Sequence, residues 1–166
     1  MAQSFTFTDN TGLVLTEIGQ AAKVAMTKSG LLMASATKAL TPVDTGATRD
    51  SFEHHVEVTK NEATATIGSG LMSAVYNEYG TGEFAEQAKS KGYWIYVPGS
   101  PAPHKKAKKY SLAEAKRIMA IMRSNGIDAH ITNGLKPKRM LRTAFAQNWD
   151  KVRKIVSDEL GSKVGR

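Results

Sequence analysis

The sequence contains no cysteine. That absence excludes disulfide bridges, zinc sites built on thiolates and thiol nucleophiles. The sequence also lacks an apolar run of the length needed to span a bilayer. Its first ten residues, MAQSFTFTDN, have no basic head followed by an apolar core, so they do not predict a secretion signal. We therefore expect a folded protein that is neither exported by such a signal nor held in a membrane.

Acidic residues are scarce relative to basic ones. The 15 Asp and Glu residues stand against 23 Lys and Arg, which gives a formal charge of +8. Such a balance permits binding to nucleic acid, to an acidic surface or to an acidic protein. Much of the excess lies in HKKAKK and KPKR, and it forms a candidate basic patch of Lys105, Lys106, Lys108, Lys109, Lys136, Lys138 and Arg139. A solvated loop is the simpler interpretation of both runs, and a phosphate-binding patch is the alternative.

A chain of 166 residues is long enough for one ordinary core, so we predict a single domain over residues 1–166. Residues 1–11 are predicted to form an extended arm, because Phe5 and Phe7 alternate with Thr6 and Thr8. Helical periodicity then runs from about residue 13 to residue 40, where Pro42 ends it. The expected buried stripe of this helix is Leu15, Ile18, Ala22, Ala25, Leu32, Ala36 and Ala39.

Alternating residues from Phe52 to Thr59 and from Ala63 to Ile67 predict a half-buried antiparallel hairpin. Residues 71–79 follow as a short helix or turn that glycines close. A last helix is expected over residues 139–161. Its predicted apolar stripe comprises Leu141, Phe145, Val152, Val156 and Leu160, with Ala144, Trp149 and Ile155 beside it.

Residues 93–132 are predicted to form a strand-helix-strand insertion. YWIYV is strongly β-forming, Ser111 and Glu114 have the spacing of a capping box, and residues 127–132 resume a strand pattern. The expected fold class is therefore α+β, with a long N-terminal helix and a C-terminal helix packed on an antiparallel sheet.

The run TPVDTG contains the Asp-Thr-Gly of an aspartic protease, so Asp44 is a candidate catalytic carboxylate. A single such motif requires a symmetric dimer in which two aspartates share a proton. The expected context is a small all-β chain, whereas here a long helix and a proline precede the motif. We therefore favour a turn, in which Gly46 accepts a positive φ and Asp44 or Thr45 caps a short helix at residues 47–51.

Other catalytic and ligand-binding patterns are weak. His54 and His55 are adjacent on a predicted strand and face opposite sides, so they cannot bind one metal together. No metal site and no cofactor site are predicted. The aromatic residues of the 93–97 strand could stack on nucleic-acid bases, but the core is the more common place for them.

Four stretches taken in order resemble the small head-tail joining proteins of tailed bacteriophages, also called tail-completion, neck or minor tail-component proteins. The resemblance covers most of residues 13–160, and the 93–132 segment looks like an insertion carried by a subset of that family. The stretches are TPVDTG at 41–46, IGS at 67–69, YNEYGTG at 76–82, and KP at 136–137 leading to LRTAF at 141–145.

The resemblance implies a structural virion protein without enzyme activity. Its subunits would form a homo-oligomeric ring, sixfold to match the tail, between the tail tube or its terminator and the head connector. The protein would be made in the host cytoplasm and would end in the virion, with DNA passing through the ring. A basic nucleic-acid-binding module is the alternative function.

Two motifs are the shared features of that family and are candidates for subunit or partner contacts. A scaffold role inside one subunit is equally consistent with the sequence. The candidate residues are Pro42, Val43, Asp44, Thr45 and Gly46 in the first motif, and Tyr76, Glu78, Tyr79, Gly80, Thr81 and Gly82 in the second.

Overall fold

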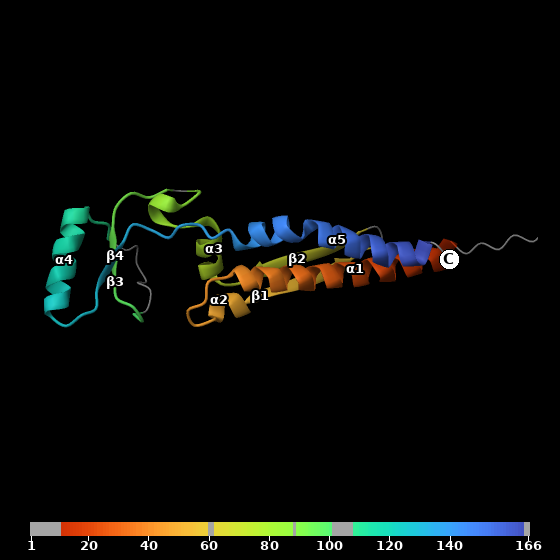
Figure 1. Ribbon diagram of the computed structural model, residues 1–166, viewed down its shortest axis with the longest axis horizontal. Helices are drawn as coiled ribbons and strands as arrows, with labels where there is room; N and C mark the ends of the chain where they lie inside the picture. The colour runs from red at the N-terminus through yellow and green to blue at the C-terminus, as the bar shows by residue number, and fades with distance from the viewer. Residues whose placement is uncertain (1–10, 60–61, 88, 101–107, 165–166) are drawn as a thin grey trace, which may run out of the picture. The chain divides into compact units, whose positions relative to one another are not determined.

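The computed structural model describes residues 11–59, 62–87, 89–100 and 108–164 of the chain (Figure 1). The predicted arm therefore lies outside the described residues, except for Thr11, which begins the first helix. The elements in order are α1 (Thr11–Leu40), α2 (Ala47–Asp50), β1 (Phe52–Val58), β2 (Ala63–Ser69), α3 (Met72–Tyr79), the 3-10 helix η1 (Gly82–Phe84), β3 (Trp94–Tyr96), α4 (Leu112–Ser124), β4 (His130–Thr132) and α5 (Met140–Val164).

The predicted α+β class is confirmed, because two long helices accompany two small antiparallel sheets. The chain divides into two compact units. Unit 1 comprises residues 1–70 and 140–166, and unit 2 comprises residues 71–139. Unit 2 extends beyond the predicted 93–132 insertion because α3 and the loop after it bond to residues 133–138. That the chain folds as one domain stays a prediction. No helix in the described ranges is both long and apolar enough to cross a membrane.

Unit 1 is built on α1, which contacts α5 along its length (Figure 1). The buried residues of α1 are mostly small, and they recur every three or four positions as Ala21, Ala25, Ser29, Gly30, Met33, Ala34 and Thr37. Small side chains on one helix face let a neighbouring element approach closely. The predicted apolar stripe of α1 was therefore partly right: Ala25 is buried and Ile18, Ala22, Leu32 and Ala36 are half-buried, whereas Leu15 and Ala39 are exposed.

The hairpin β1–β2 packs on α1. Its register pairs Phe52 with Ser69 and His54 with Ile67, and the inward residues alternate with exposed ones as predicted. Phe52 is almost completely buried. His54 lies over Gly30, where an added Cβ would come within 2.7 Å of the imidazole ring. A glycine at this place in α1 therefore allows the strand to sit directly on the helix.

Unit 2 contains the predicted strand-helix-strand segment. β3 and β4 pair antiparallel with Ile95 opposite Ile131. The capping box at the start of α4 is confirmed: the Ser111 Oγ accepts a hydrogen bond from the Glu114 N–H at 3.3 Å, and the Glu114 Oε2 accepts one from the Ser111 N–H at 2.9 Å. This reciprocal pair satisfies two N–H groups that have no partner inside the helix.

Replacement of the capping serine tests how much this box stabilises α4. Ser111→Ala should lower the free energy of unfolding by about 1 kcal/mol, the usual cost of losing a serine cap. Ser124→Ala is the matched control, because that hydroxyl bonds the Ile121 carbonyl in the last turn and leaves the cap intact. Urea unfolding followed by circular dichroism measures both, and equal effects of the two variants would contradict the capping role.

The box should also weaken in acid. The hydrogen bond from the Ser111 backbone N–H lowers the pKa of Glu114, so its stabilising effect is fully present above the carboxyl's unfolded pKa. The effect is lost as the pH falls through the lower folded pKa. The difference between wild type and Glu114→Gln should therefore shrink on acidification.

Candidate partner-binding surface

The VDTG motif is the turn that leads from α1 to β1. The Thr41 hydroxyl is buried and donates to the Thr37 carbonyl at 2.7 Å, which ends α1. Gly46, at φ 86°, is the N-cap of α2, and its carbonyl accepts from the Asp50 N–H at 2.9 Å. The Thr45 Oγ1 accepts a bond from the Ala47 N–H at 3.4 Å, so of the two predicted capping side chains it is Thr45 that contacts the helix start.

Asp44 and the neighbouring Pro42 and Val43 are exposed on this turn. The 30-residue α1 leads into Asp44, in place of the apolar strand that the catalytic aspartate of an all-β protease follows. The acidic group that is held in place nearby is Asp50, whose pKa is lowered by its hydrogen bond from Arg49, with Nε to Oδ1 at 2.8 Å. The turn thus has the geometry of a connector, and its exposed side chains are available for contact.

The EYGTG loop and Glu83, which follows it, are clamped by four hydrogen bonds to the segment after β4. The Thr81 N–H donates to the Leu135 carbonyl at 2.8 Å, and the Leu135 N–H donates to the Thr81 Oγ1 at 2.9 Å. The Glu83 N–H donates to the Asn133 carbonyl at 3.0 Å, while the Asn133 Nδ2 donates to the Glu83 Oε2 at 2.8 Å. These bonds hold the loop inside unit 2. A contact of its residues with another subunit or partner stays a prediction.

Two facing glycines allow this clamp. Gly82 has φ 64° and Gly134 has φ 136°. A Cβ on Gly82 would lie 2.1 Å from the Asn133 carbonyl oxygen, and one on Gly134 would lie 2.1 Å from the Thr81 carbonyl oxygen. No side chain fits between backbones at that distance, so both positions require glycine for space as well as for dihedral angle. Gly80, at φ 75°, meets the Leu135 carbonyl in the same way.

Above the clamp, α3 exposes an apolar face. The residues at positions i, i+3, i+4 and i+7 of this helix share one side. They are Met72, Val75, Tyr76 and Tyr79, and all four are exposed. We call them the α3 face. Three of its side chains line a hollow of about 480 Å³ together with the glycine loop. The opposite side of α3 carries Ala74 and Glu78, which are buried, so Glu78 belongs to the scaffold.

The basic patch is only partly described, since Lys105 and Lys106 lie outside the described residues. Three of the other lysines lie over aromatic rings of unit 2, with Nζ to ring-centre distances of 5.4 Å for Lys108 and Tyr110, 5.9 Å for Lys109 and Trp94, and 5.6 Å for Lys136 and Phe84. Lys109 and Lys136 therefore contact two different parts of the unit, the β3 strand and the EYGTG loop region.

The remaining basic residues of the KPKR run hold the same loop region. The Lys138 N–H donates to the Asn77 carbonyl at 2.6 Å, and the Arg139 Nε forms an ion pair with the Glu86 Oε1 at 2.7 Å. The Lys138 side chain itself is exposed. A lysine stacked on an aromatic ring keeps its charge but is anchored in position by the ring.

The remaining candidate residues are the histidines and the aromatic residues of β3. His54 faces α1 and His55 faces outward, as predicted. Within the part of the chain that the structure describes, His, Cys, Asp and Glu form no cluster of three or more that could hold a metal ion. Tyr96 stacks on His130 with ring centres 5.5 Å apart.

Neither a scan of protein-family models nor searches of curated proteins and of solved structures return a match to this chain.

Sequence reasoning missed the partner of the EYGTG loop. An Asn-Gly pair is typical of an ordinary turn, but Asn133 and Gly134 supply the glycine and two of the hydrogen-bonding groups of the clamp. A signal was present, since two Gly-containing polar loops flank the 93–132 segment. Antiparallel pairing of β3 with β4 brings the chain at the two ends of that segment together.

Introducing a methyl group into the clamp tests its rigidity. Gly82→Ala should destabilise unit 2 by more than about 2 kcal/mol, because the new Cβ collides with the Asn133 carbonyl and adopts a strained φ. Gly126→Ala is the matched control: its φ of 78° carries the same strain, but nothing lies within 4 Å of the added Cβ. Thermal unfolding measures the difference, and equal losses in the two variants would show that the backbone approach is unimportant.

Proposed function

We propose that this protein is a structural subunit of a tailed bacteriophage or phage-like particle. It forms a homo-oligomeric ring, with sixfold symmetry, at the tail end or neck, where it completes the tail and joins it to the head connector. The observation that carries the proposal is the α3 face, an exposed apolar face on a helix whose C-terminus is fixed by the glycine clamp. The final location is the virion neck.

An exposed apolar face on a rigid support is suited to binding another protein. Tyrosine and methionine are enriched at the centres of protein interfaces, and the α3 face carries two tyrosines and one methionine. Because the clamp fixes the end of α3, little conformational freedom remains to be lost on binding. The same motif, YNEYGTG, carries the resemblance to head-tail joining proteins, so one segment supports the proposal twice.

The arrangement of the basic residues also favours this function over a nucleic-acid-binding module. Lys108, Lys109 and Lys136 lie over rings of their own unit, and Arg139 is paired with Glu86. The stacked lysines thus lie at two different parts of the unit and Arg139 is already paired with a carboxylate, whereas a module that grips DNA presents unpaired cations to phosphates. A net charge of +8 suits a ring through which DNA passes without sequence recognition.

A charge placed on the α3 face tests the proposal. Tyr76 is 50% exposed, and Tyr76→Asp should weaken ring assembly or attachment to purified tail tubes at least about tenfold, as expected for a tyrosine at the centre of an interface. Ile121→Asp is the control, because Ile121 is an equally exposed apolar residue on α4 of the same unit, at 53%.

Light scattering of the purified chain and co-sedimentation with tail tubes separate the two readouts. If Tyr76→Asp lowers the mass of the oligomer, the α3 face forms the contact between subunits. If the oligomer keeps its mass but no longer co-sediments with tail tubes, the α3 face forms the contact with the tail. If Tyr76→Asp and Ile121→Asp behave alike, the α3 face is not the interface. If the wild-type chain stays monomeric and binds no tails, the proposed ring is wrong.

A further inference from the structure

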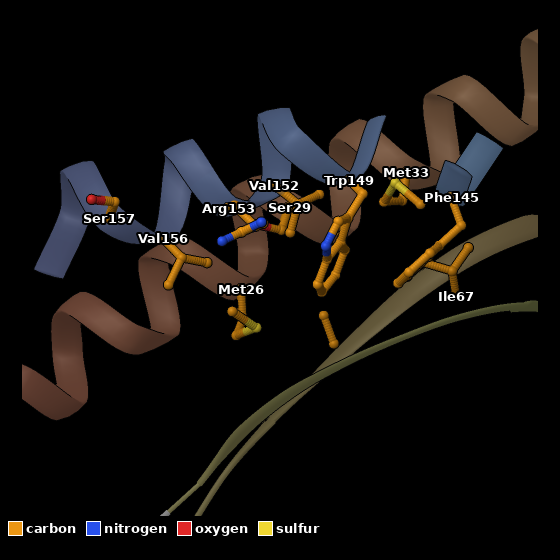
Figure 2. A pocket seen from close by; sticks show the side chains of 12 residues that line it. Met26, Ser29, Met33, Ile67, Phe145, Trp149, Val152, Arg153, Val156 and Ser157 are labelled. Carbon is orange, nitrogen blue, oxygen red and sulfur yellow. The ribbon is translucent and has the colours of Figure 1, made fainter. Parts of the chain in front are cut away.

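Unit 1 contains an apolar groove between α1, α5 and β2 (Figure 2). Its volume is about 510 Å³, and Arg153 is the one charged residue among those that line it. Met26 and Val156 lie toward one end, Phe145 and Ile67 lie at the other, and Trp149 projects into the middle. A second hollow of about 420 Å³, lined in part by Thr66 and Leu141, continues the groove along β2.

Two aromatic residues of α5 make this groove unusual. Phe145 and Trp149 stack on each other with ring centres 5.0 Å apart, yet they are 49% and 46% exposed. Their spacing predicts core positions, but the buried face of α5 is formed instead by Met140, Ala144, Asn148 and Val152. Large aromatic side chains left half-exposed beside an apolar hollow indicate a surface that another chain segment covers.

The groove follows an open sheet edge. β2 contributes Ala65 and Ile67 to the lining, two residues on the face of the sheet that turns toward α1, whereas β1 contributes no residue, so the groove lies over that face at the open edge of β2. Within the described ranges the sheet has only these two strands. A free edge of this kind offers backbone groups to a third strand, whose alternate side chains would point into the groove.

The sequence of the chain contains a segment with the chemistry to fill it. In Ser4-Phe5-Thr6-Phe7-Thr8 two phenylalanines alternate with polar residues, the pattern of a strand with one apolar face. We propose that residues 4–8 of one copy of this protein lie in the groove of a second copy as a third strand beside β2. Phe5 and Phe7 then cover the exposed rings of Phe145 and Trp149.

Length and charge fit this occupant. Five extended residues span about 17 Å, at roughly 3.3 Å per residue. From Phe145 to Val156 the groove follows α5 for about 16 Å, at 1.5 Å per residue. The one charged side chain of residues 1–10 is Asp9, which the strand carries toward the end of the groove. Arg153 is the complementary charge, one helical turn beyond Trp149.

Geometry excludes the segment of the same chain. Met26, the groove residue of α1 nearest to its start, lies about 22 Å along the helix from Thr11, and Met33 lies about 33 Å from it. A fully extended chain brings Phe7 at most about 14 Å and Phe5 about 21 Å from Thr11. Neither phenylalanine of the same chain reaches past the near end of the groove, so the occupant comes from another copy.

This inference deepens the proposed ring, because it names a contact that joins one subunit to the next. The arm contact can be wrong while the ring is right, and the experiments distinguish these two outcomes.

The first experiment uses two variants of the full chain: one lacks residues 2–9, and the other blocks the groove with Trp149→Arg. Each alone should lose the wild-type oligomer and elute as a monomer. Mixed together, they should form a 1:1 heterodimer and nothing larger, since only one arm and one open groove can meet.

Wild-type mass retained by the deletion variant would overturn the arm contact and leave the ring intact. If wild-type chains associate through the arm but form no oligomer of one fixed size, the ring is wrong and the arm contact is supported. If the chain is monomeric and, in the Trp94→Phe background, its Trp149 fluorescence changes when residues 2–9 are deleted, the arm lies in its own groove, against the inference. Circular dichroism of each variant checks that it is folded.

A peptide measurement does not depend on the Trp149→Arg variant. A synthetic peptide of residues 1–11 is titrated into the arm-deleted chain carrying Trp94→Phe, so that Trp149 is the only fluorophore of its kind. We expect a saturable blue shift. A peptide with Phe5→Ser and Phe7→Ser should bind at least about tenfold more weakly, and one with Thr6→Ser and Thr8→Ser should bind as the natural peptide does. Absence of saturation, or equal binding of all three peptides, overturns the inference.

Discussion

The close contact of α1 with its neighbours is the constraint on which unit 1 depends. Small residues such as Ala25, Ser29 and Gly30 let α5 and the hairpin lie directly against α1. A hairpin of two strands is, however, too narrow to cover both long helices. Part of the apolar surface that remains lies where Phe145 and Trp149 stand beside the residues of β2 that line the groove. The groove therefore follows from the architecture of the unit, since the two described strands leave this apolar surface uncovered.

Unit 2 depends on a different constraint, the close approach of two backbone segments. The mutual approach of Gly82 and Gly134 fixes the end of α3, and the hydrogen bonds of Thr81 and Leu135 hold it there. A short helix is marginal in isolation, so this support is what allows the α3 face to remain helical while it is exposed. Each unit thus presents an apolar surface on a rigid frame, which is the physical basis for proposing an assembly subunit.

Local patterns predicted the elements well. The hairpin, the capping box at Ser111 and the C-terminal end of α1 follow from alternation, capping chemistry and Pro42, whereas α5 continues past its expected end at residue 161 to Val164. The buried face of α1 could not be predicted from hydrophobicity. It contains Ser29 and Thr37, which are polar but small enough for the narrow space between the packed elements. The clamp was likewise missed, since the pairing of residues 81–83 with 133–135 is a contact between distant segments.

The absence of cysteine makes one measurement especially direct. Chains with Phe5→Cys and chains with Ile67→Cys are mixed, oxidised mildly and run on a non-reducing gel. If one copy completes the sheet of another, the mixture gives a disulfide-linked dimer, because residue 5 of the third strand lies at the end of the groove where Ile67 and Phe145 meet. Thr64→Cys, on the exposed face of the same strand, should cross-link far less. No dimer, or equal cross-linking at positions 64 and 67, would contradict the account.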